Sequence, residues 1–160
     1  MKYINITHPD INNGNGCRVT LWIPGCTHKC PGCHNEWTQN YNKGIEFNQS
    51  AKDLIFKLLS KDYIAGLTLS GGDPLDQSID VLNELEELTR EIKQKFPNKD
   101  IWVYTGCIYE ELSDNQLRVL KNCDILVDGP YVQSLRDVTL PFRGSSNQRI
   151  IELKNIQVVK

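Results

Sequence analysis

Hydrophobic and polar positions along this chain follow two alternating patterns, and each pattern predicts a different kind of element. Short runs rich in β-branched and aromatic residues, bounded by Gly, Pro, Asn or Asp, are typical of strands. Apolar residues three and four positions apart are typical of one face of a helix. On the first pattern we expect strands at Tyr3–Ile6, Arg18–Ile23, Gly66–Ser70, Ile101–Tyr104, Ile125–Val127, Arg149–Leu153 and Ile156–Val159.

Three stretches between these strands show the helical pattern, and each follows a polar residue suited to cap a helix. Asn48 precedes the first, Asp76 is expected to cap the second, and Ser113–Gln116 fits a capping box at the third. The apolar face of the second helix, from Ile79 to Ile92, is expected to be core. The apolar positions are Ala51, Leu54, Ile55, Leu58 and Leu59, then Ile79, Leu82, Leu85, Leu88 and Ile92, then Leu117, Val119 and Leu120.

The alternation of strands with helices predicts βαβ units and a mostly parallel sheet. Right-handed crossovers place the loops after parallel strands on one side, so four of these loops are expected to meet. A complete eight-unit barrel takes about 250 residues, whereas this chain has 160. We therefore expect an α/β fold with an open partial (β/α) barrel or curved sheet, as a single domain over residues 1–160. The converging loops would carry Cys26, Cys30 and Cys33, then Gly71–Asp73, Thr105–Gly106 and Asp128–Gly129.

Three thiols stand close together after the second predicted strand, at Cys26, Cys30 and Cys33, in a C-x3-C-x2-C spacing. Soft thiolates select iron–sulfur clusters, zinc or cuprous copper. A cubane cluster has four irons, so three local thiolates leave one iron open to a small molecule. A structural zinc ion would need a fourth protein ligand, for which His28 and His34 are nearest. His28 stands between two of the cysteines and would have to fold back to reach the same ion. Simply buried cysteines are the remaining alternative.

Composition and charge narrow the class of protein further. Basic and acidic residues nearly balance, with a formal net charge of −2 and a pI of about 5.9, so no electrostatic footprint for nucleic acid or an anionic membrane is present. Residues 1–9 contain no apolar core of signal-peptide length, and no apolar run approaches the length of a membrane span. We therefore expect a cytoplasmic location, where six cysteines indicate metal or redox chemistry rather than disulfides.

The chain resembles the radical S-adenosylmethionine enzymes, and within them the small activases of glycyl-radical enzymes. The resemblance covers nearly the whole chain and rests first on the thiol loop, on His34–Asn35 and on Gly71–Pro74. Gly32 stands where the wider superfamily usually has an aromatic residue, and Cys-Pro-Gly-Cys is typical of the activases that serve the anaerobic ribonucleoside-triphosphate reductase. The pyruvate formate-lyase activases share Cys33–Asn35 but are longer chains. Other matching segments are Leu69–Leu75, Asp100–Val103, Leu126–Gly129 and Arg143–Gln148.

This resemblance implies a fold of the radical S-adenosylmethionine type with two cofactors. A 4Fe–4S cluster would be held by Cys26, Cys30 and Cys33, and S-adenosylmethionine would bind its fourth iron. An electron from the reduced cluster would enter the sulfonium and break a C–S bond. The resulting 5′-deoxyadenosyl radical would take a hydrogen atom from a backbone glycine of a partner enzyme. The cofactors would perform the hard step, while the protein would place them, exclude water and tune the potential.

The resemblance also implies residues that bind S-adenosylmethionine. Backbone groups of Gly71, Gly72 and Asp73 would hydrogen-bond its amino group, since glycines let the backbone approach a ligand closely. The family more often has Glu at the position of Asp73. A plain strand-to-helix turn is the alternative interpretation of this segment, because Gly, Asp and Pro are ordinary turn residues.

The adenine end of the cofactor would be lined by Gly32, Cys33 and His34, with the planar ring of His34 packed on it. An exposed loop histidine is the alternative for His34. Thr105 and Asp128 are weaker candidates at strand ends. Asp128 would either hydrogen-bond a ribose or a cation, or begin the turn before Gly129 and Pro130.

Two further groups of residues carry a weaker signal. Arg143 would pair with a carboxylate, or residues 143–147 would form a polar surface loop that docks a partner. Three cysteines lack cluster spacing and are expected to be buried and free, although one of them follows a strand end near the site. They are Cys17, Cys107 and Cys123.

The partners implied by the resemblance are the large subunit of the anaerobic ribonucleoside-triphosphate reductase and an electron donor such as a flavodoxin. A homodimer within a heterotetramer is an assembly that the resemblance allows. No nucleic-acid or membrane partner is expected. One alternative keeps the chemistry and changes the partner to another glycyl-radical enzyme, such as pyruvate formate-lyase, or to a small molecule. Another, of a different class, is a non-catalytic zinc-binding module.

Overall fold

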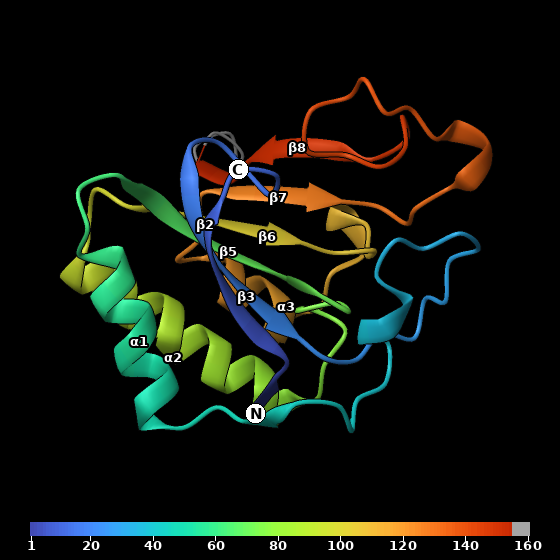
Figure 1. Ribbon diagram of the computed structural model, residues 1–160. Coiled ribbons are helices and arrows are strands. Elements are labelled where there is room, and N and C mark those ends of the chain that lie inside the picture. Colours follow the sequence, from blue (N-terminus) through green and yellow to red (C-terminus); the bar gives the residue numbers. More distant parts are fainter. Residues whose placement is uncertain (155–160) are drawn as a thin grey trace.

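The computed structural model describes residues 1–154 and is organised around one large sheet (Figure 1). Its strands, in spatial order, are β2 (Asn5–Asp10), β3 (Cys17–Ile23), β5 (Ile64–Gly71), β6 (Asp100–Tyr104), β7 (Ile125–Asp128) and β8 (Arg149–Glu152). The four middle strands run parallel, whereas β2 and β8 pair antiparallel at the edges. Two short strands, β1 (Lys2–Tyr3) and β4 (Ile45–Glu46), form a separate antiparallel pair. The predicted α/β class is therefore confirmed, and the open partial barrel stays a prediction.

The helices α1 (Gln49–Leu59), α2 (Ile79–Lys95) and α3 (Asp114–Leu120) connect successive parallel strands. The strand order from β3 to β7 never reverses, so right-handed crossovers put the connecting helices on one face of the sheet. Figure 1 shows this arrangement, with the loops after the parallel strands gathered at the opposite end from the loops that enter them. Among residues 1–154, no helix combines the length and apolar character that a membrane crossing requires.

The two faces of the sheet differ in chemistry, because successive residues of a strand point to opposite sides. Val19 and Leu21 of β3 and Val103 of β6 belong to the buried apolar cluster that also contains the inner faces of the helices. The neighbouring residues Thr20 and Trp102 are also buried but belong to the other face. The helix-covered face therefore forms the hydrophobic core, and the opposite face is partly polar.

Arg18 anchors this polar face, and its side chain has no exposed area. Its guanidinium donates to the Thr68 hydroxyl at 2.7 Å and to the Leu67 carbonyl at 2.8 Å. It also pairs with Asp100 at 2.7 Å and lies 5.5 Å from the ring centre of Trp102. A buried arginine needs such partners, since an unpaired buried charge is very costly.

The helix starts confirm two predictions and correct a third. The Asn48 side chain accepts from the Ala51 amide at 3.0 Å, so Asn48 caps α1 as predicted. Ser113 forms the predicted capping box of α3. The expectation that Asp76 caps α2 is wrong, because Ser78 is the cap and the Asp76 carboxylate accepts hydrogen bonds from another loop. Ile79 is consequently outside the core, with 54% of its surface exposed.

The strand predictions differ from the structure mainly at the two ends of the chain. The expected opening strand over Tyr3–Ile6 is divided between β1 and β2, and β2 continues to Asp10. The expected strand at Arg149–Leu153 corresponds to β8, which ends at Glu152. The strand expected at Ile156–Val159 lies outside the described residues.

Candidate metal and cofactor site

The loops that follow the parallel strands meet around one cavity of about 390 Å³, as the strand order predicted. Gly71 lines it at the end of β5 and Gly72 just after that strand, with Thr105 and Gly106 after β6 and Gly129 after β7. The volume falls in the range of small-molecule sites, roughly 300–1,000 Å³. The cysteine loop after β3 contributes Cys26, His28, Cys30, Cys33, His34 and Asn35.

The three predicted cluster cysteines are free, half-buried thiols that all face this cavity. The Cys33 amide donates to the Cys30 carbonyl at 3.1 Å, which closes a turn between the second and third thiols. Gly32 occupies that turn with a φ of +74°, a conformation that favours glycine. Three soft donors on one short loop, open to a cavity, fit an iron–sulfur cluster with one iron left for a small molecule.

His28 does fold back, as a zinc site would require, but it meets only one of the three thiols. The donor atoms of Cys26, His28 and Asp73 lie within 4.8 Å of one another, and residues 1–154 contain no second set of three such donors that close. The thiolates that hold a cubane cluster each bind a different iron, so their sulfur atoms can lie farther apart than the ligands of a single ion. Of the three cysteines, only Cys26 therefore lies close enough to His28 and Asp73 to bind one ion together with them.

Asp73 follows the two glycines and is completely buried. One carboxylate oxygen accepts from the Leu75 amide at 2.9 Å and from the Thr105 hydroxyl at 2.8 Å. The other accepts from the Gly106 amide at 2.8 Å and lies 2.8 Å from Nε2 of His28. All the partners of the Asp73 side chain named here are protein groups, and neither Asp73 nor Gly32 is among the residues that line the cavity.

The ionisation of the cysteine loop follows from these contacts. The hydrogen bond to Asp73, and next the contact with Cys107, raise the pKa of His28 to about 11, which outweighs the lowering effect of burial. The imidazole is thus positively charged at neutral pH and balances the buried carboxylate. Burial raises the pKa of the Cys26 thiol, and the negative charge of Asp73 adds to the effect.

Close packing of glycine backbones brings the loop after β5 against the cysteine loop. The Gly72 amide donates to the Ile23 carbonyl at 2.8 Å, and the Asp73 amide donates to the Gly25 carbonyl at 2.7 Å. A Cβ atom on Gly72 would lie 2.4 Å from the Gly25 oxygen. Position 72 therefore needs glycine so that the two loops can pack backbone to backbone, and the predicted approach of these glycines to a ligand stays a prediction.

The structure places the weaker candidates differently from one another. The Asp128 carboxylate accepts from Arg149 and from the Tyr109 amide, and it does not line the cavity. Arg143 lines the cavity and donates to the Gln148 carbonyl at 3.3 Å. Cys123 is buried as expected, whereas Cys17 and Cys107 are only half-buried, which corrects that expectation.

Sequence reasoning missed the wall formed by the segment between β7 and β8. Tyr131, Leu140 and Phe142 line the cavity there, and the Tyr131 ring lies 5.1 Å from the ring of His34. His34 is exposed and packs on this aromatic partner. The available signal was the run of aromatic and large apolar residues in this loop, which also includes Val132, Leu135 and Val138.

Comparisons with known proteins agree with this site. A family model described as a 4Fe-4S single cluster domain matches residues 12–151. A relative from Enterobacteria phage T4 is 44% identical over 150 residues, covering 94% of this chain and 93% of its own. Relatives from Escherichia coli K12 and Haemophilus influenzae are 42% and 40% identical over 156 residues, covering 96% of this chain and 100% and 99% of their own.

The fold, the three-thiol loop and the family match define a single-cluster iron–sulfur domain. All three relatives carry the name anaerobic ribonucleoside-triphosphate reductase-activating protein. The chain belongs to this family of activating proteins.

Proposed function

We propose that this protein activates the anaerobic ribonucleoside-triphosphate reductase by reductive cleavage of S-adenosylmethionine, and that the radical produced takes a hydrogen atom from a backbone glycine of the reductase large subunit. The observation that carries the proposal is the placement of Cys26, Cys30 and Cys33 on one cavity with the glycines after β5. The near full-length similarity to named activating proteins supports the choice of partner. A flavodoxin-like electron donor and a dimer are part of the same proposal.

A 4Fe–4S cluster bound by the three thiolates would supply the electron and an iron position for the amino acid end of S-adenosylmethionine. The glycine segment would then receive that end of the cofactor. The amides of Gly72 and Asp73 are bonded to the carbonyls of Ile23 and Gly25, and the Asp73 carbonyl accepts from Gln77. The carbonyl oxygens of Gly71 and Gly72 are therefore the ones proposed to accept from the amino group. Asp73 would hold this segment in place rather than contact the cofactor, because its amide, its carbonyl and its buried side chain all have protein partners.

The opposite part of the cavity suits a nucleoside. Cys33 and His34 line the cavity and are proposed to contact the adenine end, while Gly32 would contribute by shaping the turn before them. The pair of His34 and Tyr131 offers planar surfaces for stacking. Leu140 and Phe142 add apolar area to this wall. An apolar wall excludes water, which protects a reactive intermediate from side reactions.

The ligand assignment is tested by anaerobic reconstitution with iron and sulfide, followed by single replacement of Cys26, Cys30 or Cys33 by Ala. Each variant is expected to lose cleavage of S-adenosylmethionine, because a missing thiolate leaves the cluster incompletely held. Cys17→Ala, at the start of β3, is the matched control and should keep cleavage. Retained cleavage in any of the three loop variants contradicts the assignment. A colourless, zinc-loaded protein after reconstitution would instead support the zinc-binding module.

The partner is tested by mixing the reconstituted protein with the anaerobic reductase and recording an electron spin resonance spectrum. An organic radical on the reductase, dependent on S-adenosylmethionine, is the expected result. A parallel sample with pyruvate formate-lyase tests the alternative partner. A radical on pyruvate formate-lyase and none on the reductase would show that pyruvate formate-lyase is the partner.

A further inference from the structure

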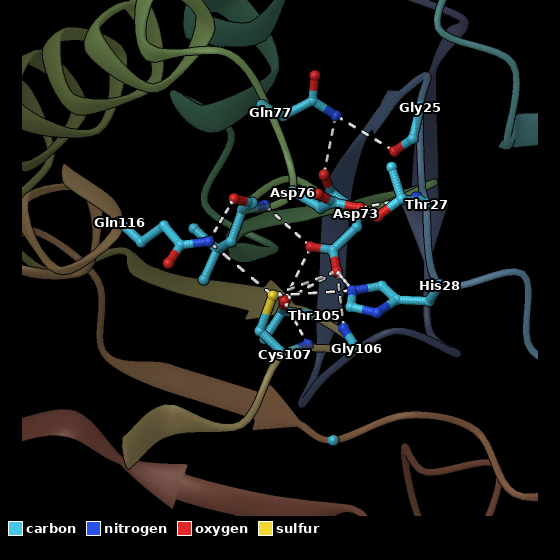
Figure 2. Close-up of polar contacts among 12 residues, drawn as sticks. Gly25, Thr27, His28, Asp73, Asp76, Gln77, Thr105, Gly106, Cys107 and Gln116 are labelled. Carbon is cyan, nitrogen blue, oxygen red and sulfur yellow. Dashed lines mark hydrogen bonds and ion pairs between the residues drawn. The ribbon is translucent and has the colours of Figure 1, made fainter. Parts of the chain in front are cut away.

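The segment Asp73–Gln77, between β5 and α2, makes hydrogen bonds to residues 24–28, which form the first half of the cysteine loop (Figure 2). The side-chain amide of Gln77 donates to the Pro24 carbonyl at 3.0 Å and to the Gly25 carbonyl at 3.3 Å. The same amide donates to the Asp73 carbonyl at 2.8 Å, which ties both segments to one side chain. The backbone just before Cys26 is thus held in place by hydrogen bonds.

The residues just after Cys26 are held by two carboxylates. Asp76 accepts from the Thr27 amide at 2.7 Å and from the Thr27 hydroxyl at 2.5 Å. Asp73 holds His28 at 2.8 Å in the buried pair described above. Partial burial raises the pKa of Asp76, but the hydrogen bonds from Thr27 and the nearby His28 and Tyr41 together lower it by more, so its pKa lies below the ordinary value. Asp76 therefore stays an anionic acceptor at neutral pH.

The second half of the loop has no such support. The backbone bond of Cys33 to the Cys30 carbonyl is internal to the loop, and among the backbone hydrogen bonds of residues 1–154 neither cysteine bonds to the segment Asp73–Gln77. The first thiol is therefore fixed on both sides, while the other two are positioned by their own turn. Holding one ligand in advance lowers the conformational entropy lost when a loop closes around a metal centre.

We propose that Asp76 and Asp73 are positioning residues that fix Cys26 for cluster binding, through Thr27 and His28, and that neither side chain contacts S-adenosylmethionine. The proposal rests on the proposed function for the identity of the cluster. The proposal gives a function to the Asp-x-x-Asp-Gln sequence that follows the two glycines. From the sequence alone, these residues are typical of a turn and a helix cap.

The decisive variants act on the exposed Thr27–Asp76 contact, where folding is at least risk. Thr27→Val removes the hydroxyl donor but keeps the shape, and Asp76→Asn removes the charge. Thr27→Ser keeps both donors and serves as the conservative rescue, while Asp62→Asn alters an exposed turn far from the loop. A lost hydrogen bond to a charged group corresponds to roughly a tenfold to hundredfold change in an equilibrium constant.

In reconstituted protein, Thr27→Val and Asp76→Asn should lose the cluster to a chelator about tenfold faster or more. Thr27→Ser and Asp62→Asn should match the wild type. Protein that still holds its cluster should bind S-adenosylmethionine with unchanged affinity and show the same cofactor-induced change in its electron spin resonance spectrum. Unchanged cluster loss, or weakened cofactor affinity with the cluster intact, overturns the proposal.

Amide hydrogen exchange in metal-free protein separates this proposal from the proposed function. The peptide covering residues 24–29 should exchange slowly in the wild type and in Thr27→Ser, and faster in Thr27→Val and Asp76→Asn. If the wild type never takes up a cluster but shows this protection, the proposed function fails and the positioning role stands. Fast exchange in the wild-type peptide would contradict the positioning role, whether or not the protein takes up a cluster.

Discussion

A single carboxylate, that of Asp73, joins three of the loops that surround the cavity. It bonds Thr105 and Gly106 after β6 and His28 of the cysteine loop, and it is itself completely buried. Breaking a buried charge pair by removing one partner typically costs about 3–5 kcal/mol. The side chain therefore matters for the shape of the whole site without facing the cavity. Nothing in the local sequence Gly-Gly-Asp-Pro distinguishes this role from that of a turn residue.

Gly72 provides a direct test of the close approach between the β5 loop and the cysteine loop. In Gly72→Ala the new methyl group would lie 2.4 Å from the Gly25 carbonyl oxygen, so one of the two backbones must move. We expect a loss of about 1–3 kcal/mol in the free energy of unfolding, together with weaker binding of S-adenosylmethionine. Urea denaturation and equilibrium binding under anaerobic conditions measure the two effects.

The matched control for this substitution is Gly144→Ala on the opposite wall. There the new methyl group would lie 3.0 Å from the edge of the Tyr131 ring, a side chain that can tilt away. A smaller loss of stability is therefore expected than for Gly72→Ala. Equal stability and equal cofactor binding in Gly72→Ala and the wild type would show that the glycine is dispensable.

Helices and strands differ in how far the sequence predicts them here. α1 and α3 begin where predicted, because Asn48 and Ser113 satisfy backbone amides that the helix itself leaves unpaired. α2 begins later than expected, since Asp76 is used by Thr27 and Ser78 takes its place as cap. Two acceptors near one helix start look alike in a sequence, and only the tertiary contact decides between them.

The full length of β2 and the polar face of the sheet could not be predicted from the sequence, because tertiary contacts determine both. The run Thr7-His8-Pro9 lacks the alternation of a half-buried strand, so the continuation of β2 to Asp10 was not expected. Arg18 is charged and would ordinarily face solvent, yet it is buried among groups from β5 and β6. The partners that make such burial tolerable lie far away in the sequence.

The capping box of α3 gives an element-level prediction. Ser113→Ala removes the acceptor for the Gln116 amide and should lower the free energy of unfolding by about 1 kcal/mol. Asn115→Ala lies in the same turn outside the box and is the comparison variant. Urea denaturation of both variants measures the difference, and a Ser113→Ala protein as stable as the wild type would contradict the role of the cap.

For the molecule as a whole, the sequence predicted which loops converge but not the full outline of the site. Parallel strands and right-handed crossovers are enough to place the cysteines beside Gly71–Gly72, Thr105–Gly106 and Gly129. They say nothing of the segment between β7 and β8, because an irregular loop has no period that fixes its path. Tyr131 and Phe142 therefore became part of the site only in three dimensions.

One apolar cluster connects α1, α2 and α3 with the sheet, which predicts that the chain unfolds as a single domain. Tryptophan fluorescence and far-ultraviolet circular dichroism of the metal-free protein should report coincident transitions in urea. Trp102 lies on the polar face, whereas the circular dichroism follows the helices on the other face. Two separated transitions would show that the faces unfold independently and that the one-domain prediction is wrong.

The segment between β7 and β8 forms one wall of the cavity, yet it hangs from different strands than the cysteine loop. The two segments nevertheless touch, because the Tyr131 ring lies 5.1 Å from the ring of His34. A change of length or side chains within residues 131–148 would therefore disturb the thiol loop as well, and we expect the two segments to diverge together among descendants of such a chain.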